Sequence, residues 1–291
     1  MALGRFRSVE EFVSDNQLIR SDNFLKLAKQ NPSMKYIKRD FLYHDGNWRG
    51  EKQNAPFRHG SKLENKLILV GHSDKATSSL DLKLIKWLLR PNYVAGTNTI
   101  SKKGFSQSLP LGMTNYSQET LLHGILGDDS HLIQASRTSE FPENFQPEIF
   151  VCFTSQNNRS VRQPLLDILA SPQQDVSVVI DEPNFTPEGR IRYLVNCRTK
   201  GFVVCPEGNG VDTHRLWEVL YMGGIPIVKS NPIMDGLYEQ LPVLVVESWS
   251  QILSATFLMR GWDEIESKKW NEEVLSQYYW DNFLMEKIAG F

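Results

Sequence analysis

Short apolar runs alternate with amphipathic segments along most of this chain, and this alternation restricts the possible folds more than any other feature. The stretches at residues 65–74 and 148–155 are short apolar runs that end in polar residues, as expected of buried parallel strands that deliver loops at their carboxyl ends. Helical periodicity follows such runs, as at residues 78–89. Strands that alternate with helices build parallel sheets, so the sequence predicts an α/β fold.

Two strand–helix series occur in the sequence, separated by a polar passage at residues 127–148 that is rich in Pro and charge. Such composition is typical of a domain boundary, and 291 residues exceed a typical single hydrophobic core. We therefore expect a first domain at residues 1–145, a second at residues 146–270, and a helical tail at residues 271–291 that packs back on the first domain.

The overall composition excludes several classes of partner. A formal net charge of -2 provides no general attraction for nucleic acid or an anionic bilayer, so an anion must be bound locally. The sequence contains no run of about 18 apolar residues and no apolar leader after Met1. We expect a cytoplasmic protein without a membrane span or a nucleic-acid partner. Its three cysteines, an odd number, are expected to be buried and reduced.

A strand, a glycine-rich loop and a helix occur together in the segment GFVVCPEGNGVDTHRLWEVLYMGGIPIV. The loop contains Gly208, Asn209 and Gly210, which allow a ligand to approach the backbone closely. The helix is expected to begin near Asp212 and Thr213, where unpaired N–H groups and the positive end of the helix dipole favour an anion. This arrangement suits a pyrophosphate.

Three polar side chains follow in the first turns of the same helix. His214 and Arg215 would donate hydrogen bonds to phosphate oxygens. Glu218 lies four residues after His214, on the same helical face, where its carboxylate could accept both hydroxyls of a ribose. The alternative is an ordinary capped helix with Glu218 exposed to solvent. Three suitable side chains on one face favour the binding interpretation.

A dinucleotide-binding Rossmann site is the main competing interpretation of this loop. The third glycine of that motif is absent, because Thr213 stands in its place. The next strand, IPIVKS, does not end in the acidic residue that would hold an adenine ribose, and the loop occurs late in the chain. A P-loop is absent from the sequence as well. The pattern therefore favours a nucleotide-sugar over a nicotinamide cofactor.

A second basic cluster, QNNRSVRQ, follows the strand that opens the second series. Arg159 and Arg162 would stand at the carboxyl edge of a parallel sheet, where open α/β proteins bind ligands. They could neutralise the phosphates of the donor, and Arg159 is the stronger candidate. A solvated surface loop is the alternative.

The segment CPEGNGVDTHRLWEVLYMGGIPIV resembles the C-terminal motif of exostosin-like glycosyltransferases, and GFSQSLPLGMTN with NYVAGTN resembles their first-domain segment. The resemblance implies a GT-B architecture, in which two Rossmann-like domains face each other across a cleft, with the nucleotide-sugar in the second domain. The chain looks closer to soluble exostosin-like enzymes of large algal viruses than to animal exostosins. That likeness implies a UDP-sugar donor, with UDP-xylose as one member, a glycan or glycoprotein acceptor, and the host cytoplasm as location.

The sequence also predicts how the reaction would be catalysed. Metal-dependent transferases usually hold their cation with an Asp-x-Asp pair, and no such pair occurs here. We therefore expect no metal and no other cofactor, with Arg159, Arg215, His214 and the helix N-terminus stabilising the departing diphosphate. The resemblance implies inversion at the anomeric carbon, which requires a general base on the acceptor side.

Candidates for that base lie in the first domain. Asp74 and His72 occur together in VGHSD, where a strand delivers its loop into the expected cleft, and Asp45 is a third candidate. Either Asp74 or His72 could instead serve as a helix cap or as a backbone hydrogen-bond partner. Asn98 and Gly112, each at the end of an expected strand, are candidate contacts for the acceptor.

Two other functional classes are compatible with these motifs. A nucleotide-binding or glycan-binding protein without catalysis would keep the second-domain motif and lack a base. A nicotinamide-dependent oxidoreductase is the weaker alternative for the reasons given above. Slow hydrolysis of a nucleotide-sugar donor would distinguish the enzyme from a binder, which leaves every donor intact.

Overall fold

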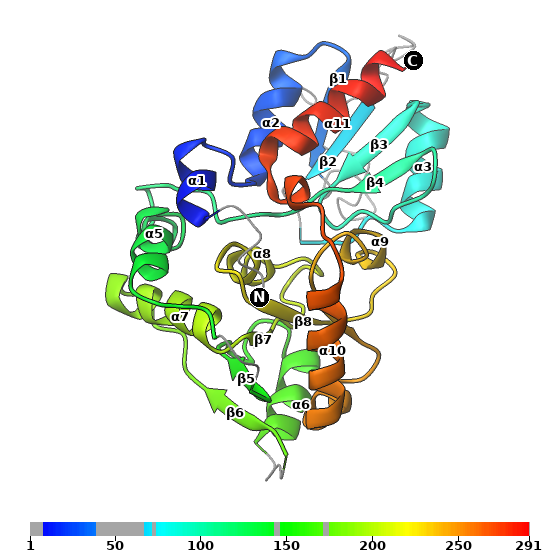
Figure 1. The fold of residues 1–291 in the computed structure, drawn as a ribbon. Helices are drawn as coiled ribbons and strands as arrows, with labels where there is room; N and C mark the ends of the chain where they lie inside the picture. Colours follow the sequence, from blue (N-terminus) through cyan, green and yellow to red (C-terminus); the bar gives the residue numbers. More distant parts are fainter. Residues whose placement is uncertain (1–7, 39–66, 72–73, 143–145, 171–174, 291) are drawn as a thin grey trace.

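The computed structural model describes residues 8–38, 67–71, 74–142, 146–170 and 175–290, and its strands form two separate parallel sheets (Figure 1). Every strand pair in both sheets is parallel. The predicted α/β class is therefore confirmed.

The first sheet has the strand order β1-β2-β3-β4. Its strands are β1 (Met34–Lys38), β2 (Leu67–Gly71), β3 (Tyr93–Gly96) and β4 (Ser106–Ser108). Side chains on the central strands alternate between two separate core clusters, as the period of two in a strand requires. Leu67 and Leu69 enter one cluster, and Ile68 and Val70 enter the other. Both faces of this sheet are thus covered.

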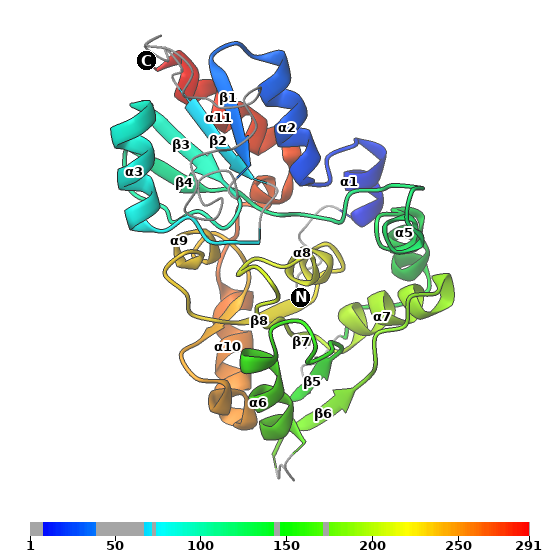
Figure 2. The ribbon, with the colours of Figure 1, turned by 180° about the vertical axis from the view of Figure 1, so that it is seen from behind.

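Helices from distant parts of the sequence cover the first sheet. Helix α2 (Ser21–Gln30) and helix α11 (Gln277–Ala289) contact each other and share the core cluster of Leu67. Helix α3 (Ser79–Leu89) covers the opposite face and lies at the outer side of the molecule (Figure 2). A reciprocal capping box between Ser78 and Asp81 starts α3.

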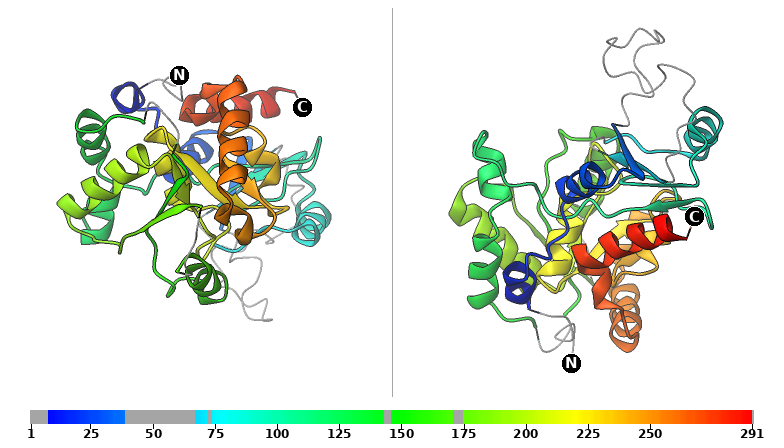
Figure 3. Two further views of the ribbon diagram at one scale, coloured as in Figure 1. Left: turned by 60° about the horizontal axis from the view of Figure 1, so that its bottom comes forward. Right: turned by 90° about the horizontal axis from the view of Figure 1, so that it is seen from above.

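The second sheet has the strand order β6-β5-β7-β8-β9. Its strands are β5 (Glu148–Val151), β6 (Ser177–Ile180), β7 (Phe202–Val204), β8 (Ile225–Lys229) and β9 (Leu244–Val246). Helices α7 (Pro187–Thr199) and α8 (His214–Tyr221) cover one face, and helices α6 (Arg159–Leu169) and α10 (Ala255–Ser267) cover the other. In Figure 3, α10 (orange) lies toward the front in the left view, and α11 (red) lies toward the front in the right view, from above.

Six shorter elements complete the described part of the chain. Helix α5 contacts both α1 and α7, and α4 also contacts α7. Both α4 and α5 precede the predicted boundary at residue 145, so elements from the first half of the sequence pack on the second sheet. The elements are α1 (Val9–Ser14), α4 (Leu121–Leu126), α5 (Ser130–Arg137), α9 (Asp235–Tyr238) and the 3-10 helix η3 (Glu272–Leu275); a further 3-10 helix, η2 (Trp249–Leu253), precedes α10.

One core cluster is continuous between the two sheets. It contains Leu69 of the first sheet, Val203 of the second, and Trp217 on α8 between them. The hydroxyl of Tyr221 on α8 accepts a hydrogen bond of 2.9 Å from the backbone N–H of Ile19. Helix α8 is therefore packed against both halves of the molecule. None of the described helices is long and apolar enough to cross a membrane.

Candidate functional site

A cavity of about 280 Å³ lies at the carboxyl ends of β5 and β6, beside the first turn of α8. Most of its wall comes from the second sheet and its helices, while Thr114, Leu122 and Leu126 contribute from the first half of the chain. Ligands of open α/β proteins bind at this edge of the sheet. The cavity is thus the first place to look for a functional site.

Arg162 on α6 forms part of the cavity wall and is 5% exposed. Its Nε donates to the carbonyl of Glu207 at 2.9 Å and its Nη1 donates to that of Thr154 at 3.2 Å. A Cβ at Gly208 would stand 3.1 Å from its Nη2, so glycine there lets this guanidinium approach the loop. Burial, together with the positive charge of Arg215, lowers the pKa of Arg162 to about 10.

Arg215 lies beside Arg162, and the two guanidinium groups share one aromatic neighbour. The guanidinium carbons of Arg162 and Arg215 lie 5.5 Å and 5.7 Å from the ring centroid of Phe153. The Nε of Arg215 is buried and has no hydrogen-bond partner. No ion pair joins either arginine to a carboxylate within the described ranges. The buried cation of Arg162 and the partly buried cation of Arg215, neither in an ion pair with a carboxylate, are electrostatically suited to an anionic ligand.

Arg190 on α7 and Glu218 on α8 form a buried ion pair in the same wall, with 2.8 Å between Nη2 and Oε1. Their side chains are 3% and 7% exposed. Burial opposes ionisation of Glu218, but the charge and hydrogen bond of Arg190 outweigh it and hold the pKa of Glu218 below its usual value. Glu218, which we expected to bind a ribose, therefore already has a cationic partner.

The outer wall of the cavity is a loop that follows β6. It contributes Asp181, Glu182 and the half-exposed ring of Phe185. Asp181 pairs with Arg192 at 3.2 Å, so its charge is partly balanced outside the cavity. The wall therefore contains three guanidinium groups and the carboxylate of Glu218, and the loop after β6 adds two further carboxylates and an aromatic ring.

The first turn of α8 borders the cavity through Thr213, His214 and Arg215. The N-cap Thr213 makes no side-chain capping hydrogen bond, so its hydroxyl does not satisfy the first N–H groups of the helix. The Nδ1 of His214 lies 2.7 Å from the carbonyl of Gly112 and must therefore carry the proton that it donates. Burial lowers the pKa of His214, which keeps the imidazole neutral near pH 7.

A hydrogen bond within its own backbone closes the glycine loop. The N–H of Gly208 donates to the carbonyl of Gly210 at 2.9 Å. Asn209 is exposed, and none of the three loop residues lines the cavity. The loop instead approaches the first half of the molecule, because a Cβ at Gly210 would lie 3.4 Å from the Cα of Asp74.

Three predicted site residues join the two halves of the molecule. The carboxylate of Asp212 accepts hydrogen bonds from the backbone N–H of Leu111 and from Nε1 of Trp217. The side-chain oxygen of Asn98 accepts from the backbone N–H of Asp212 at 2.8 Å. The carbonyl of Gly112 lies 2.7 Å from Nδ1 of His214 in the second half, and a Cβ at Gly112, whose φ is +72°, would lie 2.1 Å from the carbonyl oxygen of Ile19. These contacts give all three residues a structural role.

Of the remaining candidates that the structure describes, only Arg162 lies in the cavity wall. Asp74 is exposed and does not line the cavity, although its backbone lies against Gly210. Arg159, the favoured arginine, begins α6 at the surface and also lies outside the cavity wall, whereas Arg162 lies in it. His72 and Asp45 lie outside the described residues.

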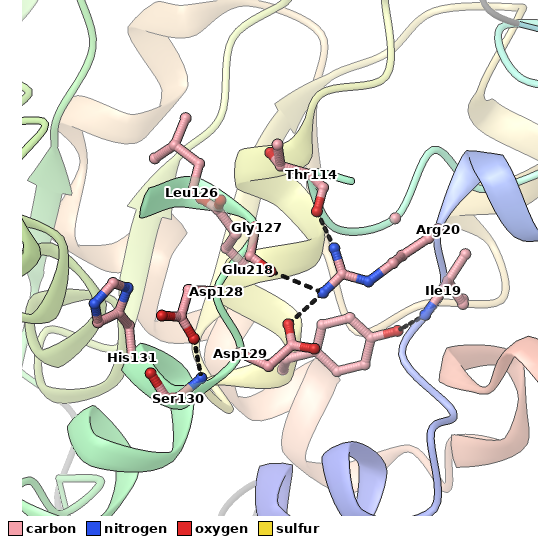
Figure 4. A network of polar contacts seen from close by, with 12 residues as sticks. Ile19, Arg20, Thr114, Leu126, Gly127, Asp128, Asp129, Ser130, His131 and Glu218 are labelled. Carbon is pink, nitrogen blue, oxygen red and sulfur yellow. Dashed lines mark hydrogen bonds and ion pairs between the residues drawn. The ribbon is translucent and has the colours of Figure 1, made fainter. Parts of the chain in front are cut away.

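A polar network holds the part of the wall that comes from the first half of the chain (Figure 4). The guanidinium of Arg20 donates to the carbonyls of Thr114 and Gly127 and pairs with the carboxylate of Asp129. The carbonyl of Leu126 lies 3.4 Å from Nη2 of Arg190. Arg20 therefore fixes both ends of the segment that carries Leu122 and Leu126 into the cavity.

Sequence reasoning missed Arg190, Phe153 and the loop after β6. The sequence signal for that loop is DEPNFTPEGR, in which acidic and aromatic residues follow a strand and Pro187 starts the next helix. Arg190, Phe153 and this loop all lie at the carboxyl edge of the second sheet, as the predicted residues Arg162 and Arg215 do. Within the described residues no cluster of three or more His, Cys, Asp or Glu could hold a metal ion.

The comparisons with known proteins assign no family. No protein-family model matches the chain, and a search of curated proteins finds no match either.

Proposed function

We propose that the chain is a glycosyltransferase that moves a sugar from a nucleotide-sugar to a glycan acceptor. The observation that carries this proposal is the pair of guanidinium groups on Phe153, from Arg162 and Arg215, neither of which has a carboxylate partner within the described residues. A diphosphate bound between them would supply the missing negative charge. Their position at the carboxyl edge of a parallel sheet supports a nucleotide ligand.

The cavity has suitable groups for the other parts of such a donor. The first N–H groups of α8 would bind the diphosphate together with Arg215. A nucleobase could stack on the exposed ring of Phe185, and Glu182 could accept hydrogen bonds from hydroxyl groups. The Arg190–Glu218 pair would orient the inner part of the ligand.

The proposed reaction is a direct displacement with inversion. The oxygen of an acceptor hydroxyl forms a bond to the anomeric carbon while the bond from that carbon to the diphosphate oxygen breaks. The hydroxyl proton passes to a general base, for which we retain Asp74, and the electron pair of the broken bond leaves with the nucleoside diphosphate. Arg162 and Arg215 would stabilise the charge that grows on this leaving group.

The proposal extends to the fold type, the location, the absence of a metal and the donor. We propose that the two sheets are the two Rossmann-like domains of a GT-B enzyme of exostosin-like type, acting in the cytoplasm without a metal. The supporting observations are the two parallel sheets, the arginines that could replace a cation, and the motif from Cys205 to Val228. We further propose a UDP-sugar as donor, with UDP-xylose the first to test.

Thermal unfolding with a panel of nucleotides and nucleotide-sugars tests the proposal. A donor that binds only the folded state raises the unfolding temperature. We expect the shift to disappear in Arg215→Ala and to persist in Arg159→Ala, because Arg159 carries the same charge outside the cavity. If no nucleotide raises the unfolding temperature, or if both variants behave alike, the proposed site is wrong.

A binding protein without catalysis is the second candidate, favoured by one observation. Asp74, the retained base, is exposed and does not line the cavity. Incubation of each nucleotide-sugar with the protein separates the two functions, since a transferase releases free sugar and nucleoside diphosphate slowly even without its acceptor. A binder shows the thermal shift and leaves the donor intact.

A further inference from the structure

The outer face of α3 exposes two large apolar side chains. Leu80 is 72% exposed and Trp87 is 74% exposed. Seven positions, or about two helical turns, separate them, so both project from the same side of the helix. The opposite side of α3 is buried in the first sheet through Leu82, Ile85 and Leu89. The exposed pair is thus not needed for the core.

The same face is strongly basic. Between Asp81 and Glu119 the sequence contains no acidic residue at all, although the whole chain has a net charge of -2. Asp81 itself is 2% exposed and caps the helix, so it presents no carboxylate to solvent. The basic residues of this stretch are Lys83, Lys86, Arg90, Lys102 and Lys103.

The turn between β3 and β4 places the two later lysines beside the helix. The Nζ of Lys86 lies 4.9 Å from the ring centroid of Phe105, which joins α3 to this turn. The backbone N–H of Lys102 donates to the carbonyl of Ser106 at 2.9 Å and closes the turn. Gly104, at its tip, has open space around the position of a Cβ. The turn therefore extends the basic surface of α3.

We propose that this α3 surface, formed by Leu80, Lys83, Lys86, Trp87, Arg90, Lys102 and Lys103, binds to bilayers that contain anionic lipids. The lysines and Arg90 contact lipid phosphates, and the side chains of Trp87 and Leu80 enter the interface between head groups and acyl chains. Tryptophan prefers that interface because its ring is apolar and its N–H is polar.

A soluble polyanion is the competing partner for a basic surface. Nucleic acid or an acidic polymer would use the charges and leave Leu80 without a contribution, since its side chain offers no charge or hydrogen bond. The combination of exposed apolar groups and cations on one helix face therefore favours the bilayer. This inference does not depend on the proposed transferase activity, since none of its residues lines the cavity.

Cosedimentation of the full chain with vesicles tests the proposal. We expect binding to phosphatidylcholine vesicles that contain about 30% phosphatidylglycerol and little binding to pure phosphatidylcholine. The variant Lys83→Glu/Lys86→Glu should bind at least about tenfold more weakly. Lys268→Glu/Lys269→Glu changes the net charge equally at exposed positions in the segment that follows α10 and should bind like the wild type.

The apolar contribution has its own variants. Leu80→Ser/Trp87→Ser should weaken vesicle binding about tenfold or more. Leu80→Ser alone should also weaken vesicle binding while leaving binding to a soluble oligonucleotide unchanged. Met259→Ser, at a residue 51% exposed on α10, is the matched control. Trp87→Phe should lose the fluorescence quenching that brominated lipids cause in the wild type.

Three results would overturn the inference. They are equal binding to neutral and anionic vesicles, vesicle binding that is unaffected by Leu80→Ser/Trp87→Ser, and binding to the oligonucleotide but not to vesicles. The last result would identify a polyanion surface instead. Circular dichroism and an unchanged unfolding temperature for each variant exclude loss of folding as the cause.

Discussion

The carboxylate of Asp212 accepts a hydrogen bond of 2.8 Å from the backbone N–H of Leu111, a residue 101 positions earlier in the chain. The same carboxylate accepts from Nε1 of Trp217, and its side chain is almost fully buried. Leu111 belongs to the segment that leaves the first sheet, whereas Asp212 precedes α8 on the second. One buried side chain thus joins the two halves of the molecule.

This contact predicts a pH dependence of stability. Burial raises the pKa of Asp212 from its ordinary 3.8 to about 7, so the folded protein holds this proton more tightly than the unfolded chain does. The contribution of Asp212 to the free energy of unfolding is therefore greatest at low pH. It falls as pH rises from about 4 to about 7 and is constant above that.

Asp212→Asn should remove this dependence. Its amide oxygen can still accept from Leu111 and Trp217. As pH rises from about 4 to about 8, the unfolding free energy of the variant should increase relative to that of the wild type by up to about 4 kcal/mol. Urea unfolding of both proteins across that range measures the difference. A difference that does not change with pH would show that Asp212 titrates normally.

The buried pair of Arg190 and Glu218 predicts a large coupling energy. Either Arg190→Met or Glu218→Leu leaves an uncompensated buried charge and should cost about 3–5 kcal/mol of unfolding free energy. The double variant should be more stable than either single variant, because both charges are then absent. The exposed pair of Arg137 and Glu10, also 2.8 Å apart, is the control and should contribute little. Additive single effects at the buried pair would contradict the expectation.

Gly112 and Gly104 have similar positive φ angles of +72° and +74° but different surroundings. Gly104→Ala meets open space and should cost only about 1 kcal/mol for its left-handed conformation. Gly112→Ala adds a clash with the carbonyl of Ile19 and should cost roughly 2–4 kcal/mol. Thermal or urea unfolding of the two variants measures both costs, and equal costs would mean that the backbone around Ile19 yields freely.

Asp74 is the retained candidate for the general base. Asp74→Ala should lower transferase turnover by about 10²–10⁴-fold while the thermal shift caused by the donor stays as in the wild type. The unchanged shift is the control for intact donor binding. Normal turnover in this variant would assign the base to another residue.

The elements that sequence patterns predicted well are those with long apolar runs. All five strands of the second sheet and the helix at Ser79–Leu89 were anticipated. Strand β1 was missed because its sequence, MKYIK, has lysines between its apolar residues. Helix α5 was missed because it lies in a polar passage and buries only His131, Leu132 and Ala135. Short or polar elements take their structure from the neighbours on which they pack.

The candidate site was predicted in part, for a related reason. Arg215 and Glu218 lie three positions apart, and their common helix face follows from the helical period. Arg162 was ranked below Arg159, yet Arg162 is the one that lies in the cavity wall. The sequence contains both arginines in similar surroundings, and only the direction in which α6 packs decides between them.

The sequence by itself determined the α/β class, the alternation of strands and helices in the second half of the chain, and the helix whose first turn borders the cavity. These properties depend on local periodicity and on residues that are neighbours in the chain. Only the tertiary structure decided that Arg190 pairs with Glu218, that Asp212 and Asn98 join the two halves, and that Leu126 lines the cavity. Such contacts unite residues far apart in the sequence, and they form because packing of the two sheets brings buried polar groups together.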